Sequence, residues 1–445
     1  MAGTVPKGTR RYRGATRRAA AVVVVASALV ATACSSTTSP TAASPATATT
    51  PGIPASAFRD HTGVTATSVS IGNVSTLSFG LFKGALVGTE AYARYVDSTG
   101  GVNGRRLVVQ GYDDHYSGEG NRQATQQAIE HDFALVGSFS LDDSYGGTLL
   151  AQQPGMPDVS EVLDPKTAAL RNVVSAVPLP LGWELGPLAF LARHDPADIR
   201  AAGALVADQP SAERQWAGEK AAMEHLGYHI AYDQTFDVTQ TTFDQNVIAM
   251  KHAGVKLLFV EQMPANYAAA VVEAMDDQDF HPVLVLGAST YSSALVPDVV
   301  RLTGSARGLD GALLEQNASL YLGEDASVIP ADAAFLHWVQ VVAPGFTPDL
   351  FTLYGWLSAE LFTEALRAAG ADPSRGSLLA SLGKITSFDG GHLVAPTDPA
   401  AKSLGNCYLL ARVVNGSIER YRDPAVSGPT HGYRCDDSFY RLPGA

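Results

Sequence analysis

Cysteine is scarce in this chain, with only Cys34, Cys407 and Cys435 among 445 residues. A metal site built on sulfur needs more thiolates, or histidines at ligand spacing beside them, and neither stands near these cysteines. Also missing are a Gly-x-Ser-x-Gly elbow, a Walker A loop and a dinucleotide-binding fingerprint. The sequence therefore predicts a protein that holds no metal and no cofactor and is not an enzyme.

Long hydrophobic runs are missing as well. Residues 1–18 carry six basic residues and no acid, an apolar run spans 19–33, and Cys34 follows. A basic start, a short apolar run and small residues before a cut describe a signal peptide, and the run is shorter than the roughly 20 residues of a membrane helix. We expect residues 1–33 to be removed at a lipoprotein cleavage site and Cys34 to be lipidated. An ordinary signal peptide or a membrane anchor is the alternative.

Positive charge is scarce beyond this leader. The leader holds 6 of the 31 basic residues and none of the 44 acids, so the remaining chain has a net charge of −19 (25 − 44). That charge argues against nucleic acid as a partner and against an anionic membrane surface. Residues 34–64 are rich in Ser, Thr, Pro and Ala, and we expect them to form a disordered tether between the lipid and the folded part.

Two cysteines remain once Cys34 carries lipid. An even pair in an oxidising compartment most simply forms one disulfide, Cys407–Cys435. The bond would close a loop of about 28 residues and stabilise the fold by about 3 kcal/mol.

The folded part alternates strands and helices. Strand-like segments lie at 68–74, 106–113, 133–139, 201–208, 229–236, 256–262 and 282–288, and helical segments lie at 83–98, 119–131, 212–226, 243–254 and 265–278. This alternation predicts βαβ units and parallel sheets. Because about 380 residues exceed one ordinary domain, we expect two doubly wound α/β lobes.

Doubly wound lobes bind ligands beyond the carboxyl ends of their strands. Asp113 and Asp114 end one strand, and the segments 138–143, 208–211 and 261–266 follow others. The two aspartates therefore have two interpretations, a role at a binding site or a role in capping and turn formation.

The segment from Ser70 to Ser140 resembles the opening of type I periplasmic solute-binding proteins. These are the leucine/isoleucine/valine-binding and amide-binding proteins of ATP-driven importers. The helix ending in "DSTGGVNGR", the strand to Asp113–Asp114, a Gln/Ala-rich helix and "LVGSFS" stand in the family's order. Later, "FTLYGWLSAELFTEALRAAG" and "CYLLARVVNGSIERY" resemble the family's late helix and closing strand pair.

The resemblance implies two lobes joined by a three-stranded hinge that the chain crosses near 176–182, 305–312 and 390–404. Lobe 1 would comprise 65–178 and 310–392, and lobe 2 would comprise 179–309 and 393–445. It further implies a monomeric, lipid-anchored, extracytoplasmic protein that captures a small solute and delivers it to the membrane permease of an ABC importer. A sensor or receptor of the same fold, not coupled to transport, is the alternative.

The resemblance also places candidate ligand contacts on the loops after strands. They are Phe79, Ser140, Leu141, Asp142, Glu161, Val162 and Leu163 in lobe 1, and Asp208, Gln262, Met263, Ser289 and Thr290 in lobe 2. Trp183 with Glu184, just beyond the first crossing, either faces the cleft or packs in the core.

Several of these positions depart from the family's pattern. Asp142 stands where hydroxyl residues are common, and Ser289 or Thr290 stands near the place of the acid that holds an ammonium in relatives. The mix of acids and apolar side chains predicts a ligand that presents N–H donors or a cationic amine beside an apolar body. A branched-chain-type amino acid and a neutral amide both meet that description, with the amino acid slightly ahead.

Overall fold

The computed structural model describes residues 52–80, 82–179, 182–261, 263–428, 431–435 and 439–442, without the side chains of Phe79 and Glu261. The predicted signal peptide, Cys34 and residues 34–51 of the predicted tether lie outside this part of the chain, and so does Gln262. For Phe79, the backbone alone is described, within the short helix η2 (Ser78–Gly80).

The segment 52–64, predicted as the end of a disordered tether, packs on the fold instead. Within it, η1 (Ala57–Arg59) buries Ala57, which is 3% exposed. The Asp60 carboxylate pairs with the guanidinium of Arg375, at 3.0 Å between Oδ2 and Nη1. The composition of this segment is typical of disorder, so it does not reveal that a few of its residues are buried or ion-paired. The ion pair depends on Arg375, which lies far along the chain.

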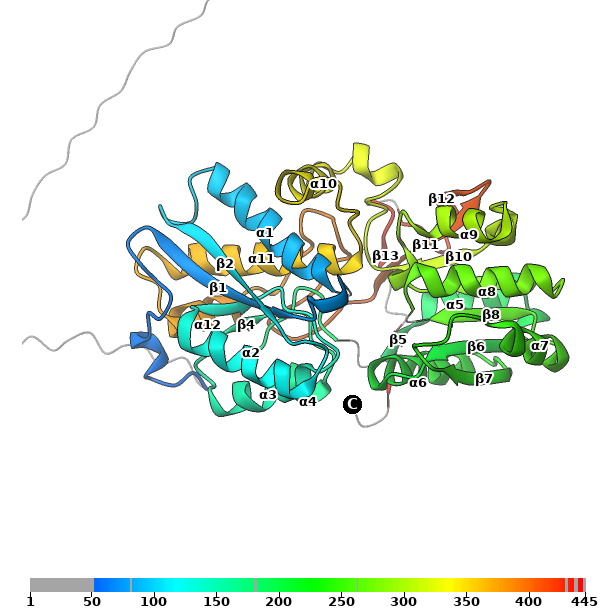
Figure 1. Cartoon of the computed structure of the whole chain (residues 1–445), viewed down its shortest axis with the longest axis horizontal. Helices are drawn as coiled ribbons and strands as arrows, with labels where there is room; N and C mark the ends of the chain where they lie inside the picture. The colour runs from blue at the N-terminus through cyan, green and yellow to red at the C-terminus, as the bar shows by residue number, and fades with distance from the viewer. Residues whose placement is uncertain are drawn as a thin grey trace, which may run out of the picture. The chain divides into compact units, whose positions relative to one another are not determined.

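The first lobe contains a four-stranded parallel sheet (Figure 1). Its order is β2 (Arg106–Asp113), β1 (Ser68–Ser75), β3 (Ala134–Val136) and β4 (Asp158–Val159). All three pairings are parallel, so the carboxyl ends of these strands meet at one edge of the sheet.

The second lobe contains an eight-stranded mixed sheet. Along its main path the order is β12 (Ser417–Arg420), β11 (Cys407–Val414), β10 (Leu313–Gln316), β9 (Val283–Leu286), β8 (Leu257–Glu261), β6 (Ala202–Ala207) and β7 (Ile230–Phe236), and β13 (Arg434–Cys435) pairs with β11. The strands from β7 to β10 are parallel, whereas β11 runs antiparallel to β10, β12 and β13. All six residues of β6 are buried, as expected for a parallel strand covered on both faces.

Helices connect the strands in both lobes. The α-helices are α1 (Lys83–Ser98), α2 (Gly118–His131), α3 (Asp143–Gln152), α4 (Pro165–Ala168), α5 (Leu185–His194), α6 (Pro210–His225), α7 (Asp244–Ala253), α8 (Ala265–Asp277), α9 (Leu295–Thr303), α10 (Pro330–Val342), α11 (Leu350–Ala369) and α12 (Arg375–Leu382). Short 3₁₀ helices are η3 (Asp198–Ala201), η4 (Ala288–Thr290), η5 (Arg307–Leu309) and η6 (Glu324–Ser327). The fold class predicted from the sequence, two doubly wound α/β lobes, is confirmed.

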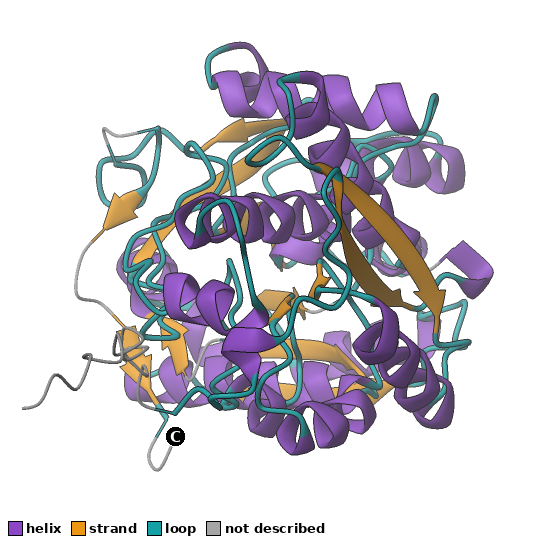
Figure 2. Ribbon diagram, turned by 90° about the vertical axis from the view of Figure 1, so that its left-hand side faces the viewer, coloured by secondary structure: helices purple, strands orange, loops and turns teal. Residues whose placement is uncertain are grey.

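The first sheet has an apolar core on each face, because its strands send side chains to both sides. Val69 and Ile71 of β1 join the large core that includes α1 and α11, whereas Val74 packs with residues of α2 and α3. Helices accordingly flank the strands on both sides (Figure 2).

Close contact between α1 and α11 depends on two glycines. A Cβ on Gly88 would lie 1.9 Å from the carbonyl oxygen of Thr352, and one on Gly355 would lie 2.0 Å from that of Ala85. Only glycine allows the two backbones to approach this closely. The Asp349 side chain caps the start of α11 by accepting a hydrogen bond from the Thr352 amide.

Three chain crossings lie side by side between the lobes. The Ala395 amide donates to the Asn317 carbonyl at 2.7 Å, the Ser319 amide donates to the Leu393 carbonyl at 2.9 Å, and the Thr397 hydroxyl donates to the Ala176 carbonyl at 2.8 Å. These hydrogen bonds bring the chain near residue 176, at 317–319 and at 393–397 into contact.

The second crossing lies later than the predicted range 305–312. Strand β10 (Leu313–Gln316) pairs with β9 and β11 and so belongs to the second sheet, whereas the sequence assigned residues from 310 onward to lobe 1. The strand is only four residues long, and its assignment depends on pairing partners that local sequence does not reveal.

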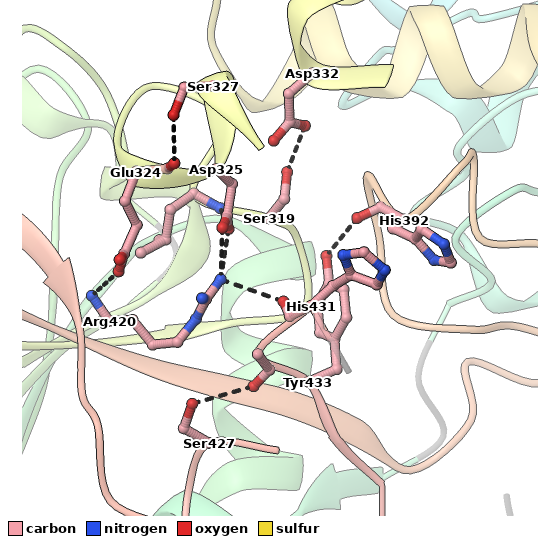
Figure 3. Close-up of polar contacts among 12 residues, drawn as sticks. Ser319, Glu324, Asp325, Ser327, Asp332, His392, Arg420, Ser427, His431 and Tyr433 are labelled. Atoms are coloured by element: carbon pink, nitrogen blue, oxygen red, sulfur yellow. Dashed lines mark hydrogen bonds and ion pairs between the residues drawn. The ribbon is translucent and has the colours of Figure 1, made fainter. Parts of the chain in front are cut away.

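The C-terminal segment is fastened to the second lobe. Cys407 and Cys435 are joined by a disulfide. The Arg420 guanidinium donates to both oxygens of Asp325, at 2.7 and 2.6 Å, and to the His431 carbonyl, while the rings of His392 and His431 stack with centroids 3.9 Å apart (Figure 3). Beyond this cluster, β14 (Phe439–Arg441) forms a two-stranded antiparallel sheet with β5 (Gly182–Glu184).

Candidate functional site

A cavity of about 150 Å³ lies between the lobes at the crossings. Lobe 1 contributes Glu161–Leu163, at the end of β4, and Tyr354 of α11. Lobe 2 contributes Trp183 and Glu184 of β5 and Glu315 and Gln316 of β10. The cavity thus lies at the carboxyl ends of parallel strands, where doubly wound sheets bind ligands.

Four of the predicted ligand contacts line this cavity: Glu161, Val162, Leu163 and Ser289. Glu161 also reaches the first crossing, because its Oε1 accepts a hydrogen bond from the Val177 amide at 3.0 Å. The Ser289 hydroxyl donates to the Met263 carbonyl at 3.1 Å.

The structure places the other described candidates elsewhere. Met263 and Thr290 are fully buried, and the Thr290 hydroxyl donates to the Gly287 carbonyl. Asp208 is exposed to solvent and is not in the cavity wall. Leu141 packs against the cluster formed by Phe82, Ala85 and Phe139. None of these side chains shares the cavity with Glu161.

The Ser140 loop turns away from the cavity and toward Asp114. The Ser140 hydroxyl donates to the Asp114 carboxylate and accepts a hydrogen bond from the Asp142 amide at 3.0 Å. Asp142 does not line the cavity, and burial, followed by the charge of Asp114, raises the pKa of its carboxyl.

The paired aspartates at the end of β2 organise these loops. The Asp113 carboxylate accepts hydrogen bonds from the amides of Leu77, Ser78 and His115. Burial raises the pKa of this carboxyl, but the three amides and the Ser78 hydroxyl outweigh burial and lower the pKa to about 2. Asp114 is 0% exposed and accepts from the Tyr116 amide at 2.9 Å. Of the two roles considered from the sequence, Asp113 and Asp114 therefore make the contacts of turn formation.

Asp143 fixes the position of the loop that carries Glu161 and Leu163. The Asp143 carboxylate accepts hydrogen bonds from the amides of Leu163, at 2.5 Å, and Asp164, at 3.1 Å. Burial raises the pKa of Asp143 to about 6, although these amides lower it. Asp143 thus links the Ser140 loop to a wall of the cavity without entering it.

Three glutamates give the cavity its electrostatic character. Burial raises the pKa of Glu161 to about 8 and that of Glu184 to about 7. Burial and, next, the nearby Glu184 carboxyl raise the pKa of Glu315 to about 8 although the indole N–H of Trp183 lowers it; that N–H makes no hydrogen bond of good geometry. No Lys, Arg or His belongs to the described part of the wall.

Sequence reasoning did not identify Glu315, Gln316, Tyr354 and Tyr408 as wall residues. The first two end β10, a four-residue strand whose place in the second sheet depends on its pairing with β9 and β11. A signal was present, since "LLEQN" is an apolar pair followed at once by polar residues. Trp183 and Glu184 were noted as a pair that either faced the cleft or packed in the core, and they line the cavity.

One polar contact bridges the lobes beside the cavity. Arg214 of α6 donates from Nη1 to the carbonyl oxygen of Leu163 at 2.5 Å. Arg214 belongs to lobe 2 and Leu163 to lobe 1, so this contact forms only when the two lobes are close together.

Two absences hold within the described ranges. No helix there is both long and apolar enough to cross a membrane. Among the same residues, no group of three or more His, Cys, Asp or Glu side chains is arranged to hold a metal ion.

Comparisons with known proteins agree with this architecture. The model of the periplasmic binding protein family matches residues 68–417. A solute-binding protein of an ABC transporter from R. palustris, solved in complex with 4-hydroxybenzoate, superposes with a TM-score of 0.66 at 16% identity, covering 83% of this chain and 97% of that one. No curated protein sequence matches the chain.

Two further solved structures are similar in fold. A fatty acid ABC transporter substrate-binding protein from Thermomonospora curvata has a TM-score of 0.65 at 16% identity and covers 86% of this chain and 95% of that one. A leucine-binding protein from Thermotoga maritima has a TM-score of 0.64 at 13% identity, with coverage of 79% and 97%. Because the names of these proteins give different ligands, the shared fold alone identifies no ligand for this chain.

Proposed function

Because this chain belongs to the periplasmic binding protein family, whose model matches residues 68–417, we propose that it is an extracytoplasmic solute-binding lipoprotein of an ABC importer. It captures a small amphipathic solute, a branched-chain-type amino acid or an amide, between its lobes. It performs no chemical reaction on that solute and passes it to a membrane permease.

The observation that carries this proposal is the inter-lobe cavity. Its wall takes side chains from lobe 1, from lobe 2 and from the crossings that join them, including Val177. A solute held there contacts both lobes at once and stabilises their closed arrangement. A ligand shifts such an equilibrium only through its higher affinity for the closed state, and a wall shared by both lobes supplies that difference.

The proposed monomer is held at the membrane surface through Cys34, which lies outside the described residues. If Cys34 carries the lipid, Cys34→Ala releases the protein from the membrane fraction, whereas Cys407→Ala with Cys34 intact serves as a cysteine control that stays membrane-bound. Retention of the Cys34→Ala protein in the membrane fraction would refute the lipid anchor.

The solute is tested directly on purified protein. Native mass spectrometry looks for a small molecule that co-purifies, and a thermal-shift screen covers amino acids, amides and small organic acids. A solute at 100 times its Kd stabilises the folded state by about 2.7 kcal/mol, which raises Tm measurably. If no compound class raises Tm and nothing co-purifies, the solute-binding proposal fails.

A further inference from the structure

The cavity contains polar atoms that have no partner in the protein. Gln316 is 3% exposed, yet neither its Nε2 nor its Oε1 makes a hydrogen bond. The Trp183 Nε1, one oxygen of Glu184 and one oxygen of Glu315 lack partners as well. Buried polar groups are normally hydrogen-bonded because an unmet one costs free energy. Their gathering on one cavity wall therefore points to a ligand there, and the three oxygens are the acceptors that the wall offers it.

The three carboxyl groups of this wall can carry only negative charge. Glu184 of β5 and Glu315 of β10 come from lobe 2, and Glu161 faces them from lobe 1. Beyond the effect of burial, Asp158, another acid, raises the pKa of Glu161, and the charges of Glu315 and Glu161 in turn raise the pKa values of Tyr228 and Tyr354. No cationic side chain among the described lining residues balances them.

Aromatic and aliphatic groups make up much of the remaining wall. Trp183, Tyr354 and Tyr408 line the cavity together with Leu163 and Leu350. Aromatic faces attract cations, and the aliphatic side chains accommodate an apolar body. A cavity of about 150 Å³ in another protein holds benzene, so a ligand of about six to eight heavy atoms fits this one.

We propose, building on the solute-binding function above, that the cavity selects an organic cation: a protonated amine on a small apolar body, with no carboxylate. The ammonium donates to Glu184 and Glu315 and to the amide oxygen of Gln316, and the apolar body lies against the aromatic and aliphatic wall. This narrows the proposed range of solutes, because it favours an amine over a zwitterionic amino acid.

A carboxylate finds no cationic side chain in the described wall of this cavity, where the unpartnered donors are the neutral N–H groups of Trp183 and Gln316. The Ser140 hydroxyl, the predicted contact for such a group, is engaged by Asp114 and by the Asp142 amide, and it does not line the cavity. An anionic group would lie beside three glutamates with no Lys, Arg or His among the described lining residues, and the Arg214 guanidinium beside the cavity is engaged by the Leu163 carbonyl. Like charges at close range disfavour ionisation of each other. Anions and zwitterions therefore bind less well than the matching amine.

Cation binding is coupled to proton release from the wall. Because the pKa values of Glu184 and Glu315 are raised to about 7 and about 8, both carboxyls are largely protonated below pH 7 in the free protein. An ammonium favours the ionised form, so its binding expels protons, and its affinity rises by about tenfold per pH unit below pH 7 for each proton released. A neutral ligand shows no such rise.

The test uses four compounds that share the apolar body of leucine. They are leucine itself, 3-methylbutylamine, 4-methylpentanamide and 4-methylpentanoate, which carry a zwitterion, a cation, a neutral amide and an anion. Titration calorimetry on the full mature protein at pH 7 measures each Kd. We expect the amine to bind about 10- to 150-fold more tightly than leucine and the anion, the range for a hydrogen bond to a charged group. If leucine, the amide or the anion binds as tightly as the amine, or if none of the four binds, the inference is overturned.

Two variants separate a contact with the cation from a general effect on the fold. Glu315→Gln is expected to weaken amine binding by at least about tenfold, to leave amide binding within about threefold and to flatten the pH dependence of the amine. Glu360→Gln is the matched control, since Glu360 is another buried glutamate, with a pKa raised to about 7, that does not line the cavity. Equal effects of both variants on the amine would overturn the inference.

The two proposals fail separately. If leucine or the amide binds best, the cation inference falls while solute binding stands. If none of the four compounds binds but the thermal-shift screen finds a solute of another class, the outcome is the same. Only the absence of any solute from both experiments removes the proposed function itself.

Discussion

The cavity glutamates predict an unusual dependence of stability on pH. In the solute-free protein, we expect the free energy of unfolding to fall as pH rises from 5 to 8. Each of these carboxyls has a higher pKa in the folded protein than the ordinary value of 4.5. The folded state therefore binds more protons than the unfolded chain in this window, and stability decreases as pH rises through the folded pKa.

The pKa of Glu184 gives the size of the expected loss of stability. A pKa of about 7 in the fold against 4.5 in the unfolded chain corresponds to about 2–3 kcal/mol of stability lost between pH 5 and 8. Two other shifted groups act outside this window: Asp113, with a pKa of about 2, affects stability only at lower pH, and Lys402, whose pKa burial lowers to about 8, affects it mainly at higher pH.

Urea unfolding at pH 5, 6.5 and 8 measures this slope in the wild type and in Glu184→Gln. The variant is expected to lose about 2 kcal/mol of the difference between pH 5 and pH 8, and more if the removal of Glu184 also lowers the pKa of Glu315. Adding 3-methylbutylamine is expected to reduce the wild-type slope, because the bound cation favours the ionised carboxyls. The reasoning is refuted if wild type and variant have the same slope, or if stability rises with pH in both.

Three further outcomes are expected. Arg375→Met should destabilise the fold by about 3 kcal/mol in urea unfolding. The reason is that the buried guanidinium donates to the carbonyls of Ile129, Asp132 and Phe133 and pairs with Asp60. A loss of stability below about 1 kcal/mol would contradict this. Ser140→Ala should leave solute affinity within about twofold while lowering stability by about 1–3 kcal/mol, whereas a large loss of affinity with unchanged stability would place Ser140 in the site. Thiol labelling of the denatured, unreduced mature protein should modify neither Cys407 nor Cys435, and labelling of both would exclude the bond.

Much of the fold could be predicted from the sequence because it depends on local periodicity. The predicted helix 83–98 is α1 to the residue, and the predicted strand 106–113 is β2. Runs of this length carry enough apolar repeats to show their period. Strand β10 has only four residues, and its lobe is decided by pairing with β9 and β11 rather than by its own pattern.

The candidate site was less predictable because it depends on side-chain direction. The loop carrying Ser140 follows a strand, as expected, but a hydrogen bond to the buried Asp114 turns the hydroxyl away from the cavity. In contrast, Glu161 enters the cavity wall as its position after β4 suggested. Contacts between distant segments determine which residue of a strand-end loop faces a ligand. The alternation of strands and helices in the sequence does not reveal these contacts.

The pairing of β5 with β14 places a condition on the order of folding. The cavity residues Trp183 and Glu184 lie on β5, whose only strand partner in the described ranges is β14 (Phe439–Arg441). Strand β14 is the last described strand to be made during synthesis, because it lies C-terminal to all the others. Both lobes can therefore be assembled while this wall is still open, and a nascent chain released before residues 439–441 are made would have the shape of a binding protein without its selectivity.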